Sequence, residues 1–327
     1  MFSQFIPNID IFIHLHITKE ATQSSKIEGT KTDLKEAIQS ENQIKGERRD
    51  DWIEVQNYVS AMNMAIEHLE KLPISSRLIK ITHKAILKGA RGHMKEPGEF
   101  RKSQNWIGGA SINSATFIPP IHSELGSLMS DLEKFANNET TKTPALVKIA
   151  IIHYQFETIH PFLDGNGRVG RLLITLYLVE QKVLEKPLLY LSEFFERNRL
   201  EYYNRLMAVR ENGVLIGWVK FFLDGVIQTA ESSIKTLESI LILEKATNEK
   251  VNSLKGKAEN AQKIIQYLYK KPIIEVAEVA KIIGFSKQSA YKLVENLEKV
   301  EILTKWGTKQ KPQLYVFDQY LSLFLDD

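Results

Sequence analysis

Apolar residues along most of the chain recur at spacings of three and four, a period typical of helices that bury one face. Signals for β-structure are few. The stretch 111–121 is rich in β-branched residues and ends in Pro119-Pro120, so it predicts a short edge hairpin, and 314–317 is a second strand candidate. The predicted fold class is therefore all-α, with a short β-hairpin. The period of three and four predicts helices at 52–69, 78–87, 124–135, 145–156, 168–179 and 218–243.

Two changes in composition divide the chain. Residues 1–50 are polar, with a charged run at 45–51, and indicate an arm laid over the main domain. The polar stretch 252–260 indicates a hinge, and beyond it helix, turn, helix and two strand candidates around a basic loop follow the pattern of a winged helix with a small β-wing. The predicted domains are a helical arm at 1–77, a main domain at 78–225, a linker helix at 226–258 and a winged-helix domain at 259–327.

The composition excludes several function classes. Of the 327 residues, 43% are hydrophobic and 25% charged, and the net charge of +3 gives no general argument for binding nucleic acid or membranes. The absence of cysteine excludes disulfides, thiolate metal sites and a cysteine nucleophile. No signal peptide is evident, and no apolar run approaches the roughly 20 residues of a membrane span. A soluble, cytoplasmic protein without membrane contact is therefore expected.

The strongest chemical signal is a glycine-rich turn that opens a helix. Gly165, Asn166 and Gly167 form a flexible turn directly before an apolar-periodic segment. Backbone N–H groups that are free at a helix N-terminus, together with the helix dipole, favour a bound phosphate. Arg168 and Arg171 lie three residues apart on the first turn, so their planar guanidinium groups can hold neighbouring phosphates.

Two further side chains complete this stretch. Asp164 precedes the turn, and a carboxylate beside phosphates is a natural ligand for Mg²⁺. His160 carries an imidazole that can accept a hydroxyl proton near neutral pH. A helix-capping turn with surface arginines and a structural histidine is the alternative, but it does not explain why all these residues are in register. The stretch supplies the parts of a phosphoryl-type transfer, in which positioning and charge stabilisation supply most of the catalysis.

The stretch 160–171 resembles the signature of the Fic family, whose histidine, phenylalanine, acidic residue, Gly-Asn-Gly turn and two arginines are all present. The resemblance extends from about residue 78 to residue 223. Residues 97–101 resemble the family's Pro-Gly-x-(Phe/Tyr)-Arg segment, and 111–122 lies where the family places its target-docking flap. Residues 191–206 resemble the segment that shapes the nucleotide's base pocket.

The resemblance implies a mainly helical enzyme that transfers AMP from ATP to a Ser, Thr or Tyr hydroxyl of a protein and releases pyrophosphate. By position, His160 would deprotonate the hydroxyl and Asp164 would hold Mg²⁺ between the α- and β-phosphates. Phe162 would anchor the loop in the core. The flap would register the target backbone by strand addition through Ile112, Phe117 and Ile118. The remaining nucleotide contacts would be Gly165, Asn166 and Gly167 in the anion hole, Arg168 at a phosphate, Arg171 at the γ-phosphate and Tyr203 at the adenine.

A second motif lies far upstream, at Ser24-Ser-Lys-Ile-Glu28-Gly29. Ser24 and Glu28 share a helix face, and Gly29 would end that helix. An ordinary exposed glutamate near a helix end is the bland alternative. The motif resembles the Fic inhibitory sequence, (Ser/Thr)-x-x-x-Glu-(Gly/Asn), which implies that Glu28 pairs with Arg171 and leaves ATP in an unproductive pose. The enzyme would then modify itself, as well as its target, once this pairing is lost.

Other functions stay open from the sequence. The region 259–327 contains ten lysines, no arginine and nine acidic residues, a net charge of +1, which is weakly basic for a DNA-binding domain. A DNA-binding regulator whose Fic site senses nucleotide is the competing class, and removal of AMP, use of another nucleotide donor, and a homodimer also stay open. The residues that would face DNA are Ser286, Lys287, Gln288, Ser289, Lys292, Lys299, Lys305, Lys309 and Lys311.

Overall fold

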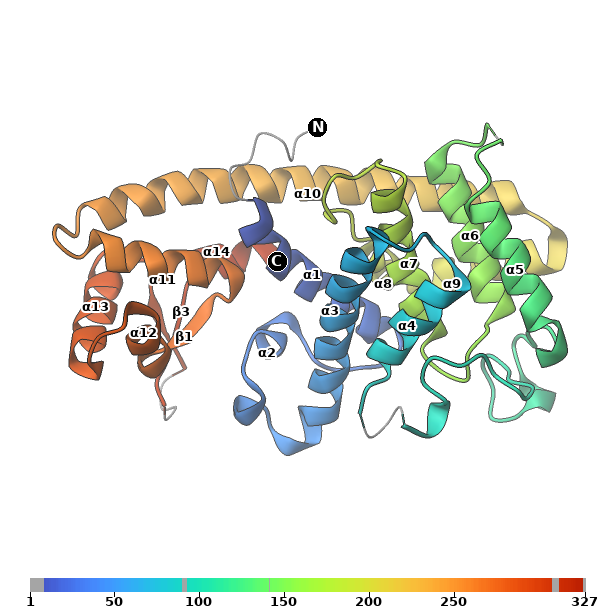
Figure 1. The fold of residues 1–327 in the computed structure, drawn as a ribbon, viewed down its shortest axis with the longest axis horizontal. Coiled ribbons are helices and arrows are strands. Elements are labelled where there is room, and N and C mark those ends of the chain that lie inside the picture. The colour runs from blue at the N-terminus through green and yellow to red at the C-terminus, as the bar shows by residue number, and fades with distance from the viewer. Residues whose placement is uncertain (1–8, 90–92, 141, 308–311, 326–327) are drawn as a thin grey trace. The chain divides into compact units, whose positions relative to one another are not determined.

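The computed structural model describes residues 9–89, 93–140, 142–307 and 312–325, which fold mainly into helices (Figure 1). The predicted lysine positions Lys309 and Lys311 lie outside these residues. The strands are β1 (Ile273–Glu275), β2 (Thr304–Trp306) and β3 (Leu314–Val316). The helices are α1 (Ile9–Ile27), α2 (Leu34–Ala37), α3 (Arg49–Leu69), α4 (Ser76–Ile86), α5 (Leu125–Ala136), α6 (Ala145–Ile159), α7 (Asn166–Glu180), α8 (Ser192–Arg197), α9 (Arg199–Asn212), α10 (Leu215–Asn252), α11 (Ala258–Lys270), α12 (Val276–Ile283), α13 (Lys287–Lys299) and α14 (Asp318–Leu321).

The helices predicted from periodicity are confirmed as α3, α4, α5, α6, α7 and α10. A helical arm was expected at the start of the chain, and α1 is helical, but the apolar period did not predict the length of this helix. The reason is that α1 buries polar side chains, including Glu20 and Ser24, as well as Phe12 and Leu15, so its apolar pattern is interrupted. No helix in the described ranges carries an apolar stretch long enough to cross a bilayer.

The described chain divides into two compact units. The motif unit comprises Glu20–Asp33 and Ile44–Ala230, and it contains the whole stretch 160–171. The C-terminal unit comprises Met1–Lys19, Leu34–Gln43 and Glu231–Asp327.

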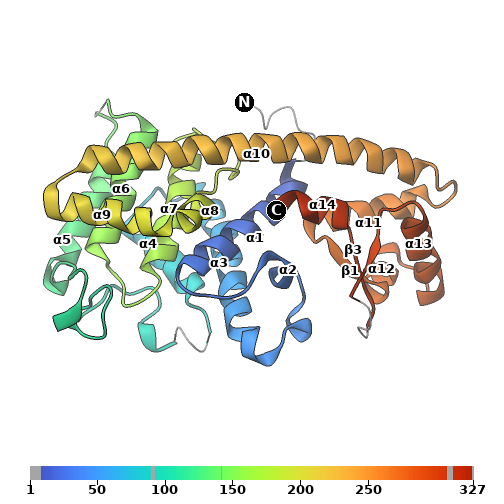
Figure 2. The same ribbon diagram turned by 180° about the vertical axis from the view of Figure 1, so that it is seen from behind.

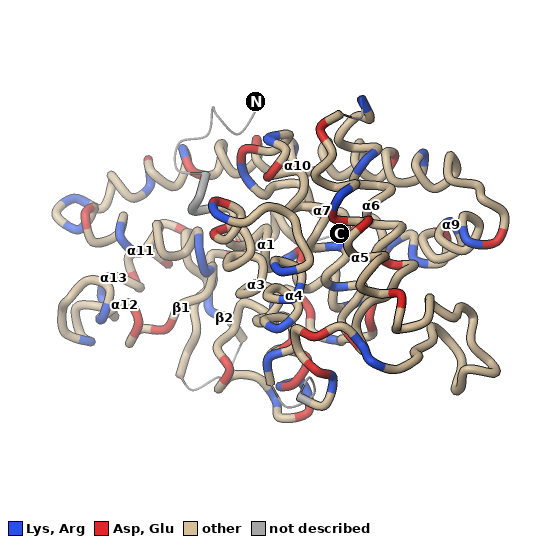
Figure 3. Tube along the Cα trace, turned by 45° about the vertical axis from the view of Figure 1, so that its right-hand side comes forward, with Lys and Arg blue, Asp and Glu red and all other residues tan. Residues whose placement is uncertain are grey.

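The C-terminal unit contains a three-stranded antiparallel sheet in the order β1-β3-β2. Ile273 pairs with Val316, and Thr304 pairs with the same residue from the other side. The predicted strand at 314–317 is confirmed as β3, whereas β1 was not predicted, because a three-residue strand is too short to show a period of two. Figure 3 shows basic and acidic residues mixed along the trace, and α13 carries three lysines and two glutamates.

The motif unit is built around α6 and α7, which lie side by side in both views of the ribbon (Figures 1 and 2). Twelve of the fifteen residues of α7 are buried, so this helix forms the centre of the unit. Trp218 of α10 is fully buried and donates from Nε1 to the carbonyl of Ala150 on α6 at 2.8 Å. His153 of α6 is also buried, with Nδ1 3.0 Å from the carbonyl of Gly170 and Nε2 2.9 Å from the hydroxyl of Tyr202. These contacts join α6 to α7, α9 and α10.

The predicted edge hairpin at 111–121 is corrected by the structure. This segment has one isolated antiparallel bridge, between Ile107 and Phe117, and a 3-10 turn at Ile112–Ser114 in place of two strands. Gly108 and Gly109 have φ values of 69° and 70°, which bend the chain away from an extended course. The double proline 119–120 removes two N–H donors on the other side, so a longer ladder cannot form.

Candidate active site

The turn between α6 and α7 is held by its own side chains. α6 ends at Ile159 and is followed by His160, whose backbone has a left-handed φ of 48°, and α7 begins after Gly165, whose φ is 77°. The buried side chain of Asn166 closes the loop, because Oδ1 accepts from the N–H of Phe162 and Nδ2 donates to its carbonyl, both at 2.8 Å. The side chain of Asn166 is therefore engaged within the loop. Its backbone N–H is one of the donors at the N-terminus of α7.

Glu28 lies directly over the anion-binding turn. Its Oε1 is 2.6 Å from Nη2 of Arg171, and a Cβ atom added at Gly167 would overlap that same oxygen. The carboxylate thus occupies the position at the α7 N-terminus where free N–H groups and the helix dipole favour an anion. Burial favours the neutral form of Glu28, but the Arg171 guanidinium outweighs it and holds the carboxyl pKa below its usual value.

Arg171 is 2% exposed, and its guanidinium donates hydrogen bonds to the upstream motif. Its Nε donates to Oγ of Ser24 at 2.9 Å, and its Nη2 donates to the Ser24 carbonyl at 2.9 Å. Burial lowers the pKa of the guanidinium, but Glu28 raises it by more, so Arg171 keeps its charge. The structure therefore brings Ser24, Glu28 and Arg171 together, as the resemblance implies.

The second arginine is also paired with a carboxylate, which sequence reasoning missed. Nη1 of Arg168 lies 3.1 Å from Oε2 of Glu54 on α3, and Nη2 lies 3.5 Å from Oδ1 of Asp164. Thr30, the residue directly after the upstream motif, donates to the same Glu54 oxygen at 3.4 Å. Glu54 is one of several acidic residues on α3, and nothing in its local sequence distinguishes it from the others.

Asp164, the residue predicted to bind the metal, has an accessible carboxylate. Its side chain is 45% exposed, and Oδ1 accepts from the N–H of Gly165 at 2.5 Å. An accessible carboxylate beside an anion site suits Mg²⁺, which prefers few carboxylates together with phosphate oxygens. A small hollow of about 70 Å³ is lined by Glu54, Asp164 and Arg168, among others.

His160 lies in a largely buried position, with a side chain that is 19% exposed. Its Nδ1 is 4.0 Å from Oε2 of Glu157, one turn earlier on α6. Burial lowers the pKa of His160 to about 4, so the imidazole is neutral at physiological pH and able to accept a proton.

Arg101 connects the histidine to the flap. The sequence identified this residue only as part of a Pro-Gly-x-(Phe/Tyr)-Arg segment, without a role. It is 2% exposed, and its Nε donates to the carbonyl of His160 at 3.0 Å. Its other nitrogens donate to the carbonyls of Ser103 at 3.1 Å and Pro120 at 2.5 Å, and its backbone N–H donates to Pro161 at 2.9 Å. One side chain thus connects the segment before the flap, the C-terminal part of the flap at Pro120 and the backbone of the candidate base.

Arg101→Met is expected to lower the free energy of unfolding by about 2–4 kcal/mol, because it removes a buried guanidinium and leaves the part-buried carbonyls of Ser103, Pro120 and His160 without this donor. Urea denaturation measures this change. Lys102→Met, at the exposed neighbouring position, is the matched control and is expected to change stability by less than about 0.5 kcal/mol. Equal stability of the two variants would contradict the role assigned to Arg101.

Glu20 is a buried residue of α1 that sequence reasoning missed. It is 3% exposed, and it accepts from both Oγ and N of Ser192, at 2.5 and 3.2 Å, and from the hydroxyl of Tyr58 at 3.3 Å. Glu20, Ser24 and Glu28 are spaced by four, so one helix face carries all three, and this spacing is the signal that could have found Glu20. Glu20 binds the second half of α1 to the segment expected to shape the base pocket.

Glu20 is expected to make stability fall as the pH rises. Burial raises its pKa from 4.5 to about 7, so between these values the folded protein retains a proton that the unfolded chain has released. This stabilisation is complete below pH 4.5 and is lost as the pH rises through 7. Between pH 5 and pH 8, wild type should lose about 1–3 kcal/mol more than Glu20→Gln in urea denaturation. Glu201→Gln on exposed α9 is the control, and a Glu20→Gln curve parallel to wild type would contradict the assignment.

The remaining predicted contacts lie at the edge of the site. Tyr203 is 38% exposed, with its ring 5.2 Å from that of the buried Tyr202. In the flap, Ile112 and Ile118 are exposed, whereas Phe117 is half-buried with the Arg210 guanidinium 4.0 Å from its ring centroid. The two isoleucines are therefore available to a partner.

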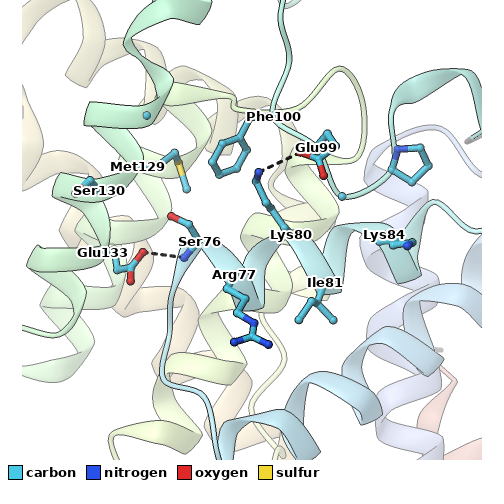
Figure 4. Close-up of a pocket in the computed structure, with 13 residues that line it drawn as sticks. Ser76, Arg77, Lys80, Ile81, Lys84, Glu99, Phe100, Met129, Ser130 and Glu133 are labelled. Carbon is cyan, nitrogen blue, oxygen red and sulfur yellow. Dashed lines mark hydrogen bonds and ion pairs between the residues drawn. The ribbon is translucent and has the colours of Figure 1, made fainter.

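A separate cavity of about 610 Å³ lies between α4, α5 and the segment 97–100 (Figure 4). None of the predicted site residues lines it. Two of its carboxylates are already engaged, because Glu99 pairs with Lys80 at 3.1 Å and Glu133 accepts from the N–H of Ser76 at 2.9 Å. Gly98, which belongs to the same segment as Arg101, is one of the residues that line this cavity.

Comparisons with known proteins agree on one family. A model described as Fic/DOC family N-terminal matches residues 1–67, and a model described as Fic/DOC family matches residues 73–178. The chain is 30% identical over 187 residues to protein adenylyltransferase Fic of Drosophila melanogaster, a match that covers 55% of this chain and 34% of the relative. It is 32% identical over 185 residues to protein adenylyltransferase Fic of Drosophila erecta, again over 34% of the relative. The chain thus spans about a third of the length of these relatives.

Solved structures show the same fold. A Fic family protein from Desulfovibrio desulfuricans aligns with a TM-score of 0.60 at 20% identity, covering 96% of this chain and 89% of that chain. A Fic domain containing signaling protein from Bacteroides thetaiotaomicron aligns with a TM-score of 0.58 at 18% identity, covering 72% of this chain and 92% of that chain.

Proposed function

We propose that this chain, which belongs to the Fic/DOC family, is a protein adenylyltransferase that moves AMP from ATP to a Ser, Thr or Tyr hydroxyl of a protein. The observation that carries the proposal is the grouping of base, carboxylate, anion-binding turn and two buried arginines around the N-terminus of α7. The turn binds phosphate through free N–H groups, and the arginines give it a charge match for a triphosphate.

The reaction is a substitution at the α-phosphorus. The hydroxyl oxygen of the target forms a bond to the α-phosphorus, the bond from that phosphorus to the oxygen that bridges to the β-phosphate breaks, and pyrophosphate leaves. His160 accepts the hydroxyl proton, and Nε2 is the nitrogen assigned to this step, since Nδ1 faces Glu157. The α7 N-terminus and Arg168 stabilise the charge on the phosphates, and Arg171 binds the γ-phosphate.

Asp164 would hold Mg²⁺ together with phosphate oxygens, and the ion, when bound, would neutralise negative charge on the phosphates. Tyr203 would contact the adenine. The exposed Ile112 and Ile118 would contact the target segment whose backbone pairs with the flap.

We further propose that Glu28 inhibits the enzyme. The carboxylate occupies the anion site over Gly167 and pairs with Arg171, so the γ-phosphate cannot use that arginine. Bound ATP would then be held in an orientation in which the hydroxyl cannot attack the α-phosphorus.

Incubation of the Glu28→Gly protein with cell lysate, Mg²⁺ and ATP labelled at either the α- or the γ-phosphate tests the transferase. Adenylylation places the α-label, and not the γ-label, on protein, and mass spectrometry then identifies the modified residues on the target and on the enzyme itself. Transfer of the γ-label would make the protein a kinase. Absence of both labels, with transfer from another nucleotide donor, would assign a different Fic activity.

DNA binding by the C-terminal unit is the second candidate function. Residues 286–289, at the start of α13, are all exposed, and Tyr291 is 54% exposed on the same helix. The recognition helix of a winged helix uses such N-terminal positions to reach base edges. A sequence-specific mobility shift with the full chain, lost in Lys287→Glu, supports this function, and a shift that is absent at low salt contradicts it.

A further inference from the structure

His83, in the last turn of α4, is a fully buried residue that contacts two segments of the candidate active site. Its ring stacks on that of Phe162 with a centroid distance of 3.6 Å and an interplanar angle of 9°. Its Nδ1 is 2.8 Å from the backbone nitrogen of Gly98, and its Nε2 is 2.9 Å from the carbonyl oxygen of Asp164. One side chain therefore joins the Pro-Gly-Glu-Phe-Arg segment to the loop that carries the candidate metal ligand.

The two partners fix the tautomer of this ring. The N–H of Gly98 can only donate, so Nδ1 must accept and carries no proton. The carbonyl of Asp164 can only accept, so Nε2 carries the proton and donates it. The neutral ring with its proton on Nε2 satisfies both contacts at once, and neither nitrogen is left for a substrate.

Close packing leaves the two segments little freedom around His83. Gly98 has a φ of 86°, and a Cβ added there would lie 3.1 Å from Cβ of Lys84 and 3.2 Å from the carbonyl of Lys80. A Cβ added at Gly165, next to Asp164, would lie 3.5 Å from Cδ2 of His83. Gly98 also lines the cavity of about 610 Å³, and its backbone N–H is held by the hydrogen bond to His83.

We propose that His83 is a positioning residue, whose Nε2–H holds the backbone of Asp164 so that its carboxylate is presented to the cation of a metal-bound nucleotide. This inference rests on the proposed function, because it takes Asp164 as the ligand. His83 acts through Asp164 and does not touch the substrate.

Two substitutions distinguish the effect of the hydrogen bond from His83 to Asp164 from the effect of packing. In His83→Gln the side-chain amide nitrogen reaches about as far as Nε2, so the donor to Asp164 is retained. In His83→Asn the shorter amide reaches only the Nδ1 position, so the acceptor for Gly98 is retained and the bond to Asp164 is lost. Both are made in the Glu28→Gly background, where the anion site is free.

The measurement is the binding of Mn²⁺, followed by electron paramagnetic resonance, to the protein saturated with a non-hydrolysable ATP analogue. His83→Asn is expected to weaken Mn²⁺ binding by about tenfold or more, and His83→Gln by less than about threefold. Nitrogen chemical shifts of the parent should show the Nε2–H tautomer of His83. Equal weakening in both variants, or unchanged binding in His83→Asn, overturns the proposal.

Cation binding does not require AMP transfer. The role of His83 and the transferase function can therefore be rejected independently of each other. A selective loss in His83→Asn together with no transfer of label from ATP would retain the role of His83 and reject the transferase. Normal transfer with equal Mn²⁺ affinity in all three proteins would do the reverse. Thermal unfolding of each variant, with a transition temperature near that of the parent, confirms that the comparison is made on folded protein.

Discussion

Replacement of Glu28 by glycine is expected to raise the rate of AMP transfer from ATP by about 10- to 100-fold, the range that coupling energies between two sites usually span. The wild-type carboxylate pairs with Arg171 and overlaps the space beside Gly167. Removing it frees both the guanidinium and the helix N-terminus for the γ-phosphate. The initial rate of incorporation of α-labelled AMP into the enzyme itself measures the change.

Matched variants identify the cause of the increase. Glu28→Gln keeps the size of the side chain and removes its charge, so it should activate less than glycine if the carboxamide still fills the site. Glu201→Gln removes a carboxylate from an exposed pair with Arg205 and should leave the rate unchanged. A Glu28→Gly protein no more active than wild type would show that Glu28 does not inhibit the enzyme.

The second large effect is expected at the candidate base. His160→Ala in the Glu28→Gly background should lower the rate of AMP transfer by about 10²- to 10⁴-fold, because the target hydroxyl then has no group to take its proton. The affinity for ATP, measured by calorimetry, should stay within about threefold, since the phosphate contacts assigned to α7 are unchanged. Loss of ATP binding together with transfer would make His160 a binding residue instead.

Backbone strain at His160 calls for a second variant. Its φ of 48° is left-handed, a conformation that costs alanine about 1–2 kcal/mol but is easier for asparagine. His160→Asn is therefore expected to keep the loop folded while losing transfer to the same extent. His68→Ala, on α3, is the control histidine and should transfer AMP at the parental rate.

The residues of the candidate site could be predicted from the sequence because they lie close together along the chain. The base, the carboxylate, the turn and both arginines lie within the stretch 160–171, and the helix that follows shows its own apolar period. Spacing within a single turn and helix dictates which side chains share a face, so no distant contact is needed to read it. The same holds for Ser24 and Glu28, which were predicted to share a face of one helix.

The sequence predicted less well where structure depends on pairing between distant segments. Strand β1 forms because Ile273–Glu275 pairs with Leu314–Val316 of β3. Its three residues are too few to show a period in the sequence. The flap was expected to form a hairpin, but its glycines and double proline leave one bridge. In both segments the ladder is set by the partner and the turn geometry, and composition alone does not encode either.

The residues that surround the motif could be identified only from the tertiary structure. Glu54 meets Arg168 across 114 positions of sequence, His83 meets Asp164 across 81, and Arg101 meets His160 across 59. In sequence, Glu54 is one charge among several on an amphipathic helix, and His83 is one polar residue within an apolar period. Each acquires its partner because packing of α3 and α4 against α7 removes water and leaves it facing one complementary group. The packing of the core determines which partner each of these residues contacts. The residues that hold the site in place could therefore not be identified from the sequence.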